Sequence, residues 1–316
     1  MTDTQGHIPV MMTSVLETLA PQGGDTIVDG TFGGGGYTKH ILKSADCKVI
    51  GIDRDPDAVT RGRKLEQENP NFKMIEGRFG DLENLLAEND IGRVDGFVLD
   101  IGVSSFQLDQ AERGFSFIQD GPLDMRMSQS GESAADIVNT YGEKEIADIL
   151  YRYGDERKSR RIASRIVERR KEEPFKTTLD LANLIENTIG RKRKPTDAHP
   201  ATRSFQALRI AVNDEMGELE RALEGAISIL KPGGRLVVVS FHSTEDRIVK
   251  KFLREKSGDI PRGSRHLPVQ RQEKSLYWFN CPDRRARAPS DQEIKDNIRA
   301  RSAKLRYGIR TDHETE

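Results

Sequence analysis

A group of glycines directly after a short apolar run could hold an adenosine-containing cofactor. The run Thr26–Asp29 is followed by Gly30–Gly36, in which five of the seven residues are glycine. Glycine has no Cβ and adopts positive φ at little cost, so the backbone of such a loop can approach a ligand closely. Asp53 follows about twenty residues later, where a carboxylate can accept hydrogen bonds from both hydroxyls of a ribose. The alternative is a tight turn without a ligand, with Asp53 as a helix cap.

Nicotinamide dinucleotides and S-adenosylmethionine both fit such a loop, and two features favour the second. The loop departs from GxGxxG, because Thr31 and Phe32 delay the glycines, whereas a pyrophosphate requires a tight turn aimed at a helix N-terminus. The turn Lys231–Gly234 into the apolar run Arg235–Phe241 is also similar to the late strand of Rossmann methyltransferases. We therefore expect methyl transfer, with hydride transfer as the less favoured alternative.

Asp100 ends a further apolar run and could serve the acceptor of the methyl group. If the acceptor is an amine conjugated with an aromatic ring, its lone pair must be freed before it can attack a sulfonium methyl. A carboxylate or carbonyl that accepts an N–H bond would orient the amine and take up developing positive charge. Asp100 is the first candidate, with Asp124 and the pair Glu245 and Asp246 behind it. A purely structural or cofactor-binding role for Asp100 stays open.

Histidine and cysteine offer two other chemistries at this stage. His242 could contact the substrate or transfer a proton, since imidazole titrates near neutral pH; a hydrogen-bonded histidine at a strand end is the alternative. Methylation at carbon 5 of a pyrimidine base would require a cysteine nucleophile. Cys47 lies just before the second apolar run and Cys281 lies in an Arg-rich region near the C-terminus, so neither follows Asp100. Carbon-5 chemistry is therefore disfavoured.

The elements that must position these residues alternate between strand and helix. The expected strands are 26–29, 48–52, 72–75 and 94–100, and the intervening helices include 37–42 and 57–68. This alternation predicts crossover units that bury a parallel sheet between two helical layers. The later expected helices are 143–153, 157–171, 178–189 and an amphipathic helix 205–230 that covers the sheet, before a fifth strand at 235–241.

The same pattern predicts two structural units. After Asp100 the alternation stops for about a hundred residues and helical pieces replace it, which indicates an insertion. We expect a Rossmann-like S-adenosylmethionine methyltransferase domain of the α/β class, formed by residues 1–110 and 210–316. Residues 111–209 are expected to form an inserted helical domain that recognises the substrate.

The composition limits the partners and the location. Lys and Arg number 50 against 51 Asp and Glu, a formal net charge of −1, so RNA would need a local basic patch. The stretch 191–209, with six basic residues and one acidic residue, is a candidate, and a solvated loop is the alternative. No long apolar stretch, export signal, disulfide framework or metal-ligand spacing appears. We expect a cytoplasmic protein that neither binds a metal nor enters a membrane.

Several segments closely resemble the bacterial 16S rRNA cytosine-N4-methyltransferases, also called the MraW family, along nearly the whole chain. They are His7–Val10, Asp29–Gly33 with Gly35 and Gly36, Asp100–Asp109, Arg113–Phe117, Leu123–Met127, His199–Arg203, Phe205–Ile210, Phe241–Ser243 with Glu245–Arg247, and Arg301–Arg306. The sequence departs from the family's usual residues at Tyr37 for His, Thr244 for Leu and Ile298 for Pro.

The resemblance implies S-adenosylmethionine as cofactor and a cytidine of 16S rRNA as target, within the small ribosomal subunit. It places the glycine loop with Gly33 and the following residues at the family's cofactor positions: Gly35, Gly36, Tyr37, Asp53, Phe79, Asp100 and Gln107. Asp100, Asp124 and His242 are the candidate catalytic residues. The oligomeric state stays open.

Two rival functions remain. DNA amino-methyltransferases usually carry Asp, Asn or Ser followed by Pro-Pro and an aromatic residue after the fourth strand, and Asp100–Val103 lacks both prolines. A ribosome-assembly factor that binds the cofactor without turnover is the other rival, against which the glycine loop, Asp53 and Asp100 argue.

Overall fold

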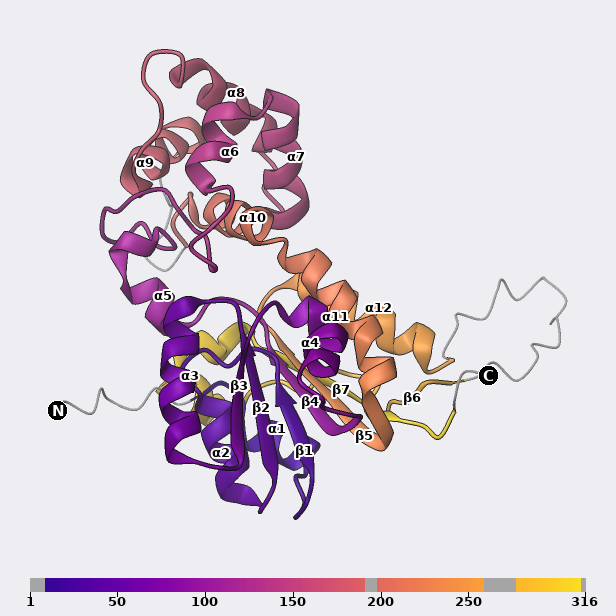
Figure 1. Ribbon diagram of the computed structural model, residues 1–316. Helices are drawn as coiled ribbons and strands as arrows, with labels where there is room; N and C mark the ends of the chain where they lie inside the picture. Colours follow the sequence, from indigo (N-terminus) through magenta and orange to yellow (C-terminus); the bar gives the residue numbers. More distant parts are fainter. Residues whose placement is uncertain (1–8, 191–197, 259–276, 314–316) are drawn as a thin grey trace, which may run out of the picture. The chain divides into compact units, whose positions relative to one another are not determined.

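The chain folds into two compact units (Figure 1). The computed structural model describes residues 9–190, 198–258 and 277–313. The first unit comprises residues 1–102 and 217–316 and contains the sheet, and the second comprises residues 103–216 and is helical. The sequence placed these divisions at 110/111 and 209/210, so the helical unit starts eight residues earlier and ends seven later than expected.

The sheet has seven strands in the order β3-β2-β1-β4-β5-β7-β6. The strands are β1 Thr26–Asp29, β2 Lys48–Asp53, β3 Phe72–Glu76, β4 Val94–Asp100, β5 Leu230–Ser240, β6 Phe279–Asn280 and β7 Lys304–Arg310. The first five pair in parallel, whereas β7 runs antiparallel to β5 and β6 antiparallel to β7. The predicted Rossmann-like α/β class is confirmed.

Helices cover both faces of this sheet because successive strand residues point to opposite sides. Val28 and Ile50 enter one core, and their neighbours Ile27 and Val49 enter the other. The first core is closed by α4 (Leu82–Glu88), α11 (Glu215–Ile229) and α12 (Ser243–Lys256). The second is closed by α1 (Met12–Leu19), α2 (Gly36–Ser44), α3 (Pro56–Glu68) and the turn η3 (Ile298–Ser302).

The predicted single helix 205–230 is wrong, because two helices occupy this stretch. α10 (Thr202–Asn213) ends at Asp214, whose φ of 50° is left-handed, and α11 follows. The Asn213 side chain explains the break: its amide nitrogen donates to the Met125 carbonyl over 2.7 Å and its oxygen accepts from the Met127 amide over 2.9 Å. Consequently, the apolar side chains of α10 enter the core of the helical unit, and only those of α11 cover the sheet.

The helical unit has a core of its own. Its helices are α5 Ser105–Asp109, α6 Ala134–Thr140, α7 Glu143–Gly154, α8 Ser159–Arg169, α9 Thr178–Ile189 and α10, with the short turn η2 Ala111–Arg113. Phe175, Leu181 and Ile185 are among the side chains buried at its centre. The predicted helices 143–153, 157–171 and 178–189 match α7, α8 and α9 within a few residues.

The C-terminal part of the sheet differs from expectation in two respects. The segment predicted as a turn, Lys231–Gly234, lies inside β5, where the register with β4 shifts. β7 was not predicted, because basic residues interrupt its apolar pattern in Lys304-Leu305-Arg306-Tyr307. The helices in the described part of the chain include none with the length and apolar character that a membrane crossing requires.

Candidate active site

Three aspartates end three neighbouring strands at one edge of the sheet. Asp29 ends β1, Asp53 ends β2 and Asp100 ends β4. Because β1 lies between β2 and β4, and the chain crosses from one side of β1 to the other, this edge is the switch point at which open α/β sheets bind ligands. The sequence named Asp53 and Asp100 as site residues but gave Asp29 no role of its own.

Asp53 holds the glycine loop against the end of β2. Its carboxylate accepts the amide of Gly33 over 2.8 Å and the amide of Asp55 over 2.9 Å. Burial raises the pKa of Asp53, and these backbone hydrogen bonds lower it in part. Each carboxylate oxygen has two lone pairs, so both oxygens keep the capacity to accept a further hydroxyl.

The glycines of the loop serve its conformation and its packing. Gly33 and Gly35 have φ values of 52° and 74°, which L side chains rarely adopt. A Cβ on Gly36 would lie 2.4 Å from Cγ of Pro9, and one on Gly35 would lie 2.9 Å from the Phe32 ring. These two glycines therefore let neighbouring side chains pack against the loop, while their predicted approach to a ligand stays a prediction.

Tyr37 connects this loop to Asp100. Its hydroxyl donates to the Val10 carbonyl over 2.6 Å, and it also lies near the Asp100 carboxyl, whose pKa it lowers. Burial, followed by the charges of Asp100 and Asp29, raises the pKa of Tyr37 well above its usual range. The phenol is thus a permanent hydrogen-bond donor, which gives Tyr37 a role where the sequence left its side chain in doubt.

Asp100 is half-buried, and one oxygen of its carboxyl lies inside the protein without a hydrogen-bond partner among the described residues. Its backbone amide donates to the Thr31 hydroxyl over 2.7 Å, but its Oδ1 is inaccessible to solvent and has no partner among the described residues. Burial raises the pKa of Asp100 to about 8, and the charges of Asp29 and Glu245 add to this. A carboxyl that has a pKa close to neutral pH and an oxygen without a hydrogen-bond partner is suited to accept or release a proton.

Asp29 supports this arrangement from β1. Its carboxylate accepts the Thr38 hydroxyl over 2.7 Å and the Thr31 amide over 3.3 Å. Burial raises its pKa to about 6, against the opposing effect of the Thr38 hydrogen bond. The sequence signal was available, because three apolar runs each end in aspartate.

The side chains of His242 and Glu245 lie against each other at the N-terminus of α12. Nδ1 of His242 accepts the Glu245 amide over 3.5 Å, while Nε2 lies 2.6 Å from Oε1 of Glu245. The second oxygen of Glu245 accepts the amides of Phe241 and His242 over 2.8 and 3.2 Å. Both ring nitrogens thus face the chain's own groups, which favours the structural alternative for His242; its catalytic role stays a prediction.

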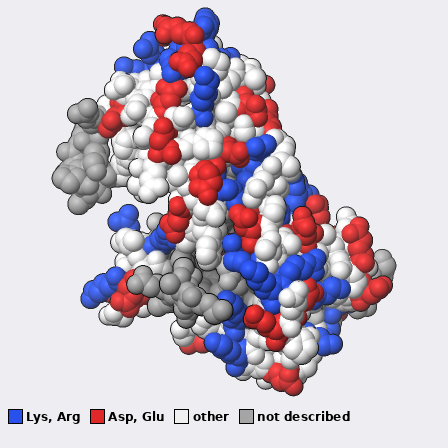
Figure 2. Space-filling model, turned by 60° about the vertical axis from the view of Figure 1, so that its left-hand side comes forward, with Lys and Arg blue, Asp and Glu red and all other residues white. Residues whose placement is uncertain are grey.

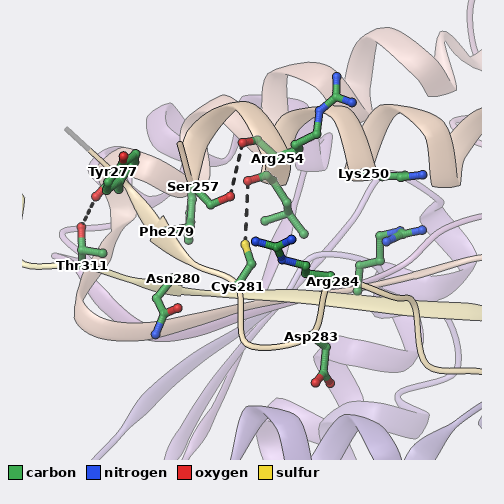
Figure 3. A pocket seen from close by; sticks show the side chains of 12 residues that line it. Lys250, Arg254, Ser257, Tyr277, Phe279, Asn280, Cys281, Asp283, Arg284 and Thr311 are labelled. Atoms are coloured by element: carbon green, nitrogen blue, oxygen red, sulfur yellow. Dashed lines mark hydrogen bonds between the residues drawn. The ribbon is translucent and has the colours of Figure 1, made fainter. Parts of the chain in front are cut away.

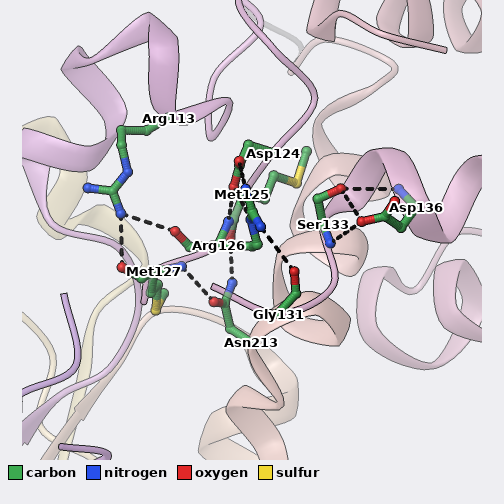
Figure 4. A network of polar contacts seen from close by, with 9 residues as sticks. All are labelled: Arg113, Asp124, Met125, Arg126, Met127, Gly131, Ser133, Asp136 and Asn213. Atoms are coloured by element: carbon green, nitrogen blue, oxygen red, sulfur yellow. Dashed lines mark hydrogen bonds and ion pairs between the residues drawn. The ribbon is translucent and has the colours of Figure 1, made fainter. Parts of the chain in front are cut away.

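The other candidate carboxylates are also engaged. Asp246 accepts Lys304 and Arg306 over 3.1 and 2.7 Å. In the helical unit, Asp124 forms a bidentate ion pair with Arg126, with nitrogen–oxygen distances of 3.0 and 2.6 Å (Figure 4). Burial works to raise the pKa of Asp124, but the Arg126 hydrogen bonds outweigh it and the pKa is lowered.

The remaining predicted residues have clear local positions. Gln107, in the helical unit, closes the first turn of α5: its side-chain oxygen accepts the Ser104 amide over 2.9 Å. Phe79 starts the turn η1 (Phe79–Asp81) after β3 and packs against the first core of the sheet. Their contact with a cofactor stays a prediction.

Neither cysteine has the environment of a nucleophile. Cys47 is buried, and burial followed by the charges of Asp25 and Asp46 raises the pKa of its thiol. Cys281 is half-buried, and its thiol faces the Leu253 carbonyl over 3.8 Å. The part of the chain that the structure describes contains no group of three His, Cys, Asp or Glu side chains that could hold a metal ion.

Comparison with known proteins identifies the family. Residues 4–310 match the family described as the MraW methylase family. The chain belongs to the MraW methylase family. It is 57% identical over 307 residues to the Ribosomal RNA small subunit methyltransferase H of Hyphomonas neptunium. The aligned residues cover 97% of this chain and 89% of that protein. The protein of the same name from Rhodospirillum rubrum is 56% identical over 310 residues, covering 97% and 94%.

Membership of the MraW methylase family confirms the predicted resemblance, the predicted methyltransferase activity and S-adenosylmethionine as methyl donor. Among solved structures, TrmN from Thermus thermophilus is 10% identical with a TM-score of 0.42, over 95% of this chain and 48% of that one. A SAM-dependent O-methyltransferase from Thermotoga maritima is 13% identical with a TM-score of 0.40, over 100% and 70%.

Proposed function

We propose that this chain transfers a methyl group from S-adenosylmethionine to the exocyclic N4 amine of a cytidine in small-subunit (16S) ribosomal RNA. The name of its MraW relatives supports ribosomal RNA of the small subunit as the substrate. The observation that carries the proposed chemistry is the partnerless, buried Oδ1 of Asp100 at the carboxyl end of β4. The reaction is proposed to take place in the cytoplasm, on RNA within the small subunit.

The residues at the sheet edge fit the cofactor. S-adenosylmethionine supplies an electrophilic methyl group on a sulfonium when it is bound. Asp53 keeps acceptor capacity for ribose hydroxyls on both oxygens, and the left-handed loop at Gly33 and Gly35 presents backbone beside it. Residues proposed to line this site are Gly33, Gly35, Gly36, Tyr37, Asp53, Phe79, Asp100 and Gln107.

Asp100 is the best of the candidate proton acceptors, because the others are already engaged. One oxygen of Glu245 accepts two backbone amides, and the other lies 2.6 Å from Nε2 of His242 without forming a hydrogen bond, so His242 covers it. Asp124 is paired with Arg126. The vacant oxygen of Asp100 can accept an N–H of the cytosine amine, which localises the nitrogen lone pair and aims it at the methyl group. In this role Asp100 also receives the proton that the amine loses.

The helical unit is proposed to recognise the RNA. Not every basic residue of the stretch 191–209 is available for this role. Residues Arg191–Lys194 lie outside the described residues. Arg209 pairs with Glu215 through two nitrogens, over 2.8 and 2.9 Å, so its charge is already balanced. Figure 2 shows basic and acidic side chains interspersed over the face in view, in agreement with the net charge of −1. RNA binding therefore depends on local groups of charge.

One experiment tests the reaction. Small subunits and free 16S rRNA, both lacking the modification, are incubated with the protein and S-adenosylmethionine that carries a labelled methyl group, and the nucleosides are then separated. We expect labelled N4-methylcytidine from the wild type and from Cys47→Ala/Cys281→Ala, since attack by an amine needs no enzyme thiolate. A label in 5-methylcytidine, or in no nucleoside with either substrate, would overturn the proposal.

A further inference from the structure

A basic pocket lies on the sheet-containing unit, beside α12 and away from the three strand-end aspartates in sequence. Its volume is about 400 Å³, and its lining comes from α12, β6, β7 and the segment after β6. Figure 3 shows Lys250 and Arg254 projecting from α12, Arg284 on the opposite wall and Tyr277 at one end. Four of the lining side chains are basic, Lys250, Arg254, Arg284 and Arg306, and one is acidic, Asp283.

Two acidic side chains at the pocket, Asp283 in its lining and Asp246 behind it, are already paired, and the exposed Glu255 of α12 lies outside the lining. Asp283 accepts Nε of Arg287 over 2.8 Å. Asp246, on the inner side of α12, is shared by Lys304 and Arg306. The charges of Lys250 and Arg254 consequently have no acidic counterpart there, and neither side chain makes an ion pair or hydrogen bond with a described residue.

The exposed face of α12 extends this positive charge beyond the pocket. Arg247, Lys250, Lys251 and Arg254 follow the spacing i, i+3, i+4, i+7, which places them on one side of a helix. All four are exposed, while Val249, Phe252 and Leu253 face the core. This stripe of positive charge, on a chain whose net charge is −1, produces a local electrostatic potential that attracts a polyanion.

An aromatic ring stands at the end of the pocket in a fixed position. Tyr277 is 45% exposed, and its ring lies against Gly258, whose absent Cβ would be 1.2 Å from Cε1 of Tyr277. The backbone on both sides is tied down: the Trp278 amide donates to the Lys256 carbonyl over 2.8 Å, and the Thr311 hydroxyl donates to the Tyr277 carbonyl. A held, half-exposed ring beside cations is the combination that binds single-stranded nucleic acid.

We propose that the α12 stripe and this pocket bind the phosphodiester backbone of single-stranded RNA, with a base stacked on Tyr277. This inference rests on the proposed function, since it takes the RNA substrate as the ligand, and it adds a second contact to that substrate outside the methyl-transfer site. Lys and Arg neutralise phosphates without reading sequence, so the contact contributes affinity and position, not the choice of cytidine.

The test compares two variants that lose the same charge. Arg247→Gln/Lys250→Gln/Arg254→Gln removes three cations from α12, and Lys43→Gln/Lys48→Gln/Lys64→Gln removes three exposed cations from elsewhere on the same unit. Binding of a fluorescein-labelled single-stranded RNA of about twelve nucleotides is measured across a salt series. Three lost phosphate contacts should lower the log–log salt slope by about 2 for the α12 variant, and the control should keep the wild-type slope.

Activity on rRNA supplies a second readout. We expect the α12 variant to raise KM for RNA while kcat and the affinity for S-adenosylmethionine stay unchanged. Tyr277→Ala should weaken RNA binding about tenfold, and Tyr277→Phe should restore it because the ring is retained. A wild type that binds RNA with the expected slope but methylates no cytidine would overturn the proposed function and leave this binding site standing.

Three results would overturn the inference. Equal slopes for the wild type and the α12 variant would mean that the stripe is only solvated surface. An equal loss in the two triple variants would mean a general charge effect. If the α12 variant lost affinity for polyglutamate and kept its affinity for RNA, the surface would serve an acidic protein instead.

Discussion

Two predicted catalytic carboxylates, Asp100 and Asp124, have opposite surroundings. Asp124 lies in a polar network in which Arg126, Arg113 and Asn213 hold the loop that follows α5 (Figure 4). Its charge is balanced and its pKa is lowered, although burial opposes this. Asp100 has an oxygen without a hydrogen-bond partner, lies near the charges of Asp29 and Glu245, and has a pKa that burial raises to about 8.

The difference separates a group that stabilises a fold from one that is held ready for chemistry. A half-buried carboxylate with a bidentate arginine partner has little capacity left for a substrate, and removing one partner of such a pair lowers stability. A buried carboxyl oxygen without a partner costs stability, and such groups persist where a reaction uses them. On this contrast we propose Asp100 for the reaction and Asp124 for the architecture of the helical unit.

The strongest test of this contrast is a pair of matched substitutions. Asp100→Asn should lower the single-turnover rate on rRNA by about 10²–10⁴-fold, because an amide cannot take the amine proton. Its free energy of unfolding at pH 7 should not fall. Asp124→Asn should instead lower the free energy of unfolding by about 1.5–3 kcal/mol, since it weakens a charge-assisted pair, and should keep the rate where the protein is folded. Exchanged effects would reverse the assignment.

Removal of Asp53, the carboxylate that we propose binds the ribose, should give a smaller loss that is confined to the cofactor. Asp53→Ala is expected to weaken S-adenosylmethionine binding by about 1.5–3 kcal/mol, the range for hydrogen bonds to a charged group. Titration calorimetry measures this directly, with NAD as the negative control for the wild type. Unchanged affinity for S-adenosylmethionine in a folded Asp53→Ala protein would remove Asp53 from the cofactor site.

Stability against pH reports the burial of Asp100. A folded-state pKa of about 8, against 3.8 for the free side chain, means that the folded chain binds more protons than the unfolded chain between about pH 4 and pH 8. The free energy of unfolding therefore falls as pH rises through this window, by at most about 1.4 kcal/mol per pH unit. Asp100→Asn should fall less steeply in urea unfolding at pH 5, 6, 7 and 8, whereas parallel curves would show that Asp100 is not buried as a neutral acid.

The smallest expected effect concerns His242. As a helix cap it should contribute about 1 kcal/mol, so His242→Ala should lower the midpoint of thermal unfolding slightly, and His242→Asn should restore much of it. Neither change should alter kcat by more than about threefold or shift the pH dependence of the rate. A large loss of kcat in a fully folded His242→Asn protein would show that the imidazole transfers a proton after all.

The sequence by itself determined which residues end the strands. The apolar runs before Asp53 and Asp100 predicted those ends, and parallel strands place their carboxyl ends at a common edge of the sheet. The helices α7, α8 and α9 followed in the same way from local periodicity. These features depend on residues close together in the chain, where pattern and spacing suffice.

The tertiary structure decided which of these residues have partners. Three of these contacts connect segments that are distant in sequence. They are the hydrogen bond from Tyr37 to Val10, the effect of the Glu245 charge on Asp100, and the hydrogen bond from Asn213 to Met125 at the break between α10 and α11. β7 likewise forms only because β5 offers it an edge, and its basic residues find Asp246 on α12. Burial and hydrogen bonding are properties of such long-range contacts, which is why the sequence could rank Asp100 before Asp124 but could not show how far their surroundings differ in the folded protein.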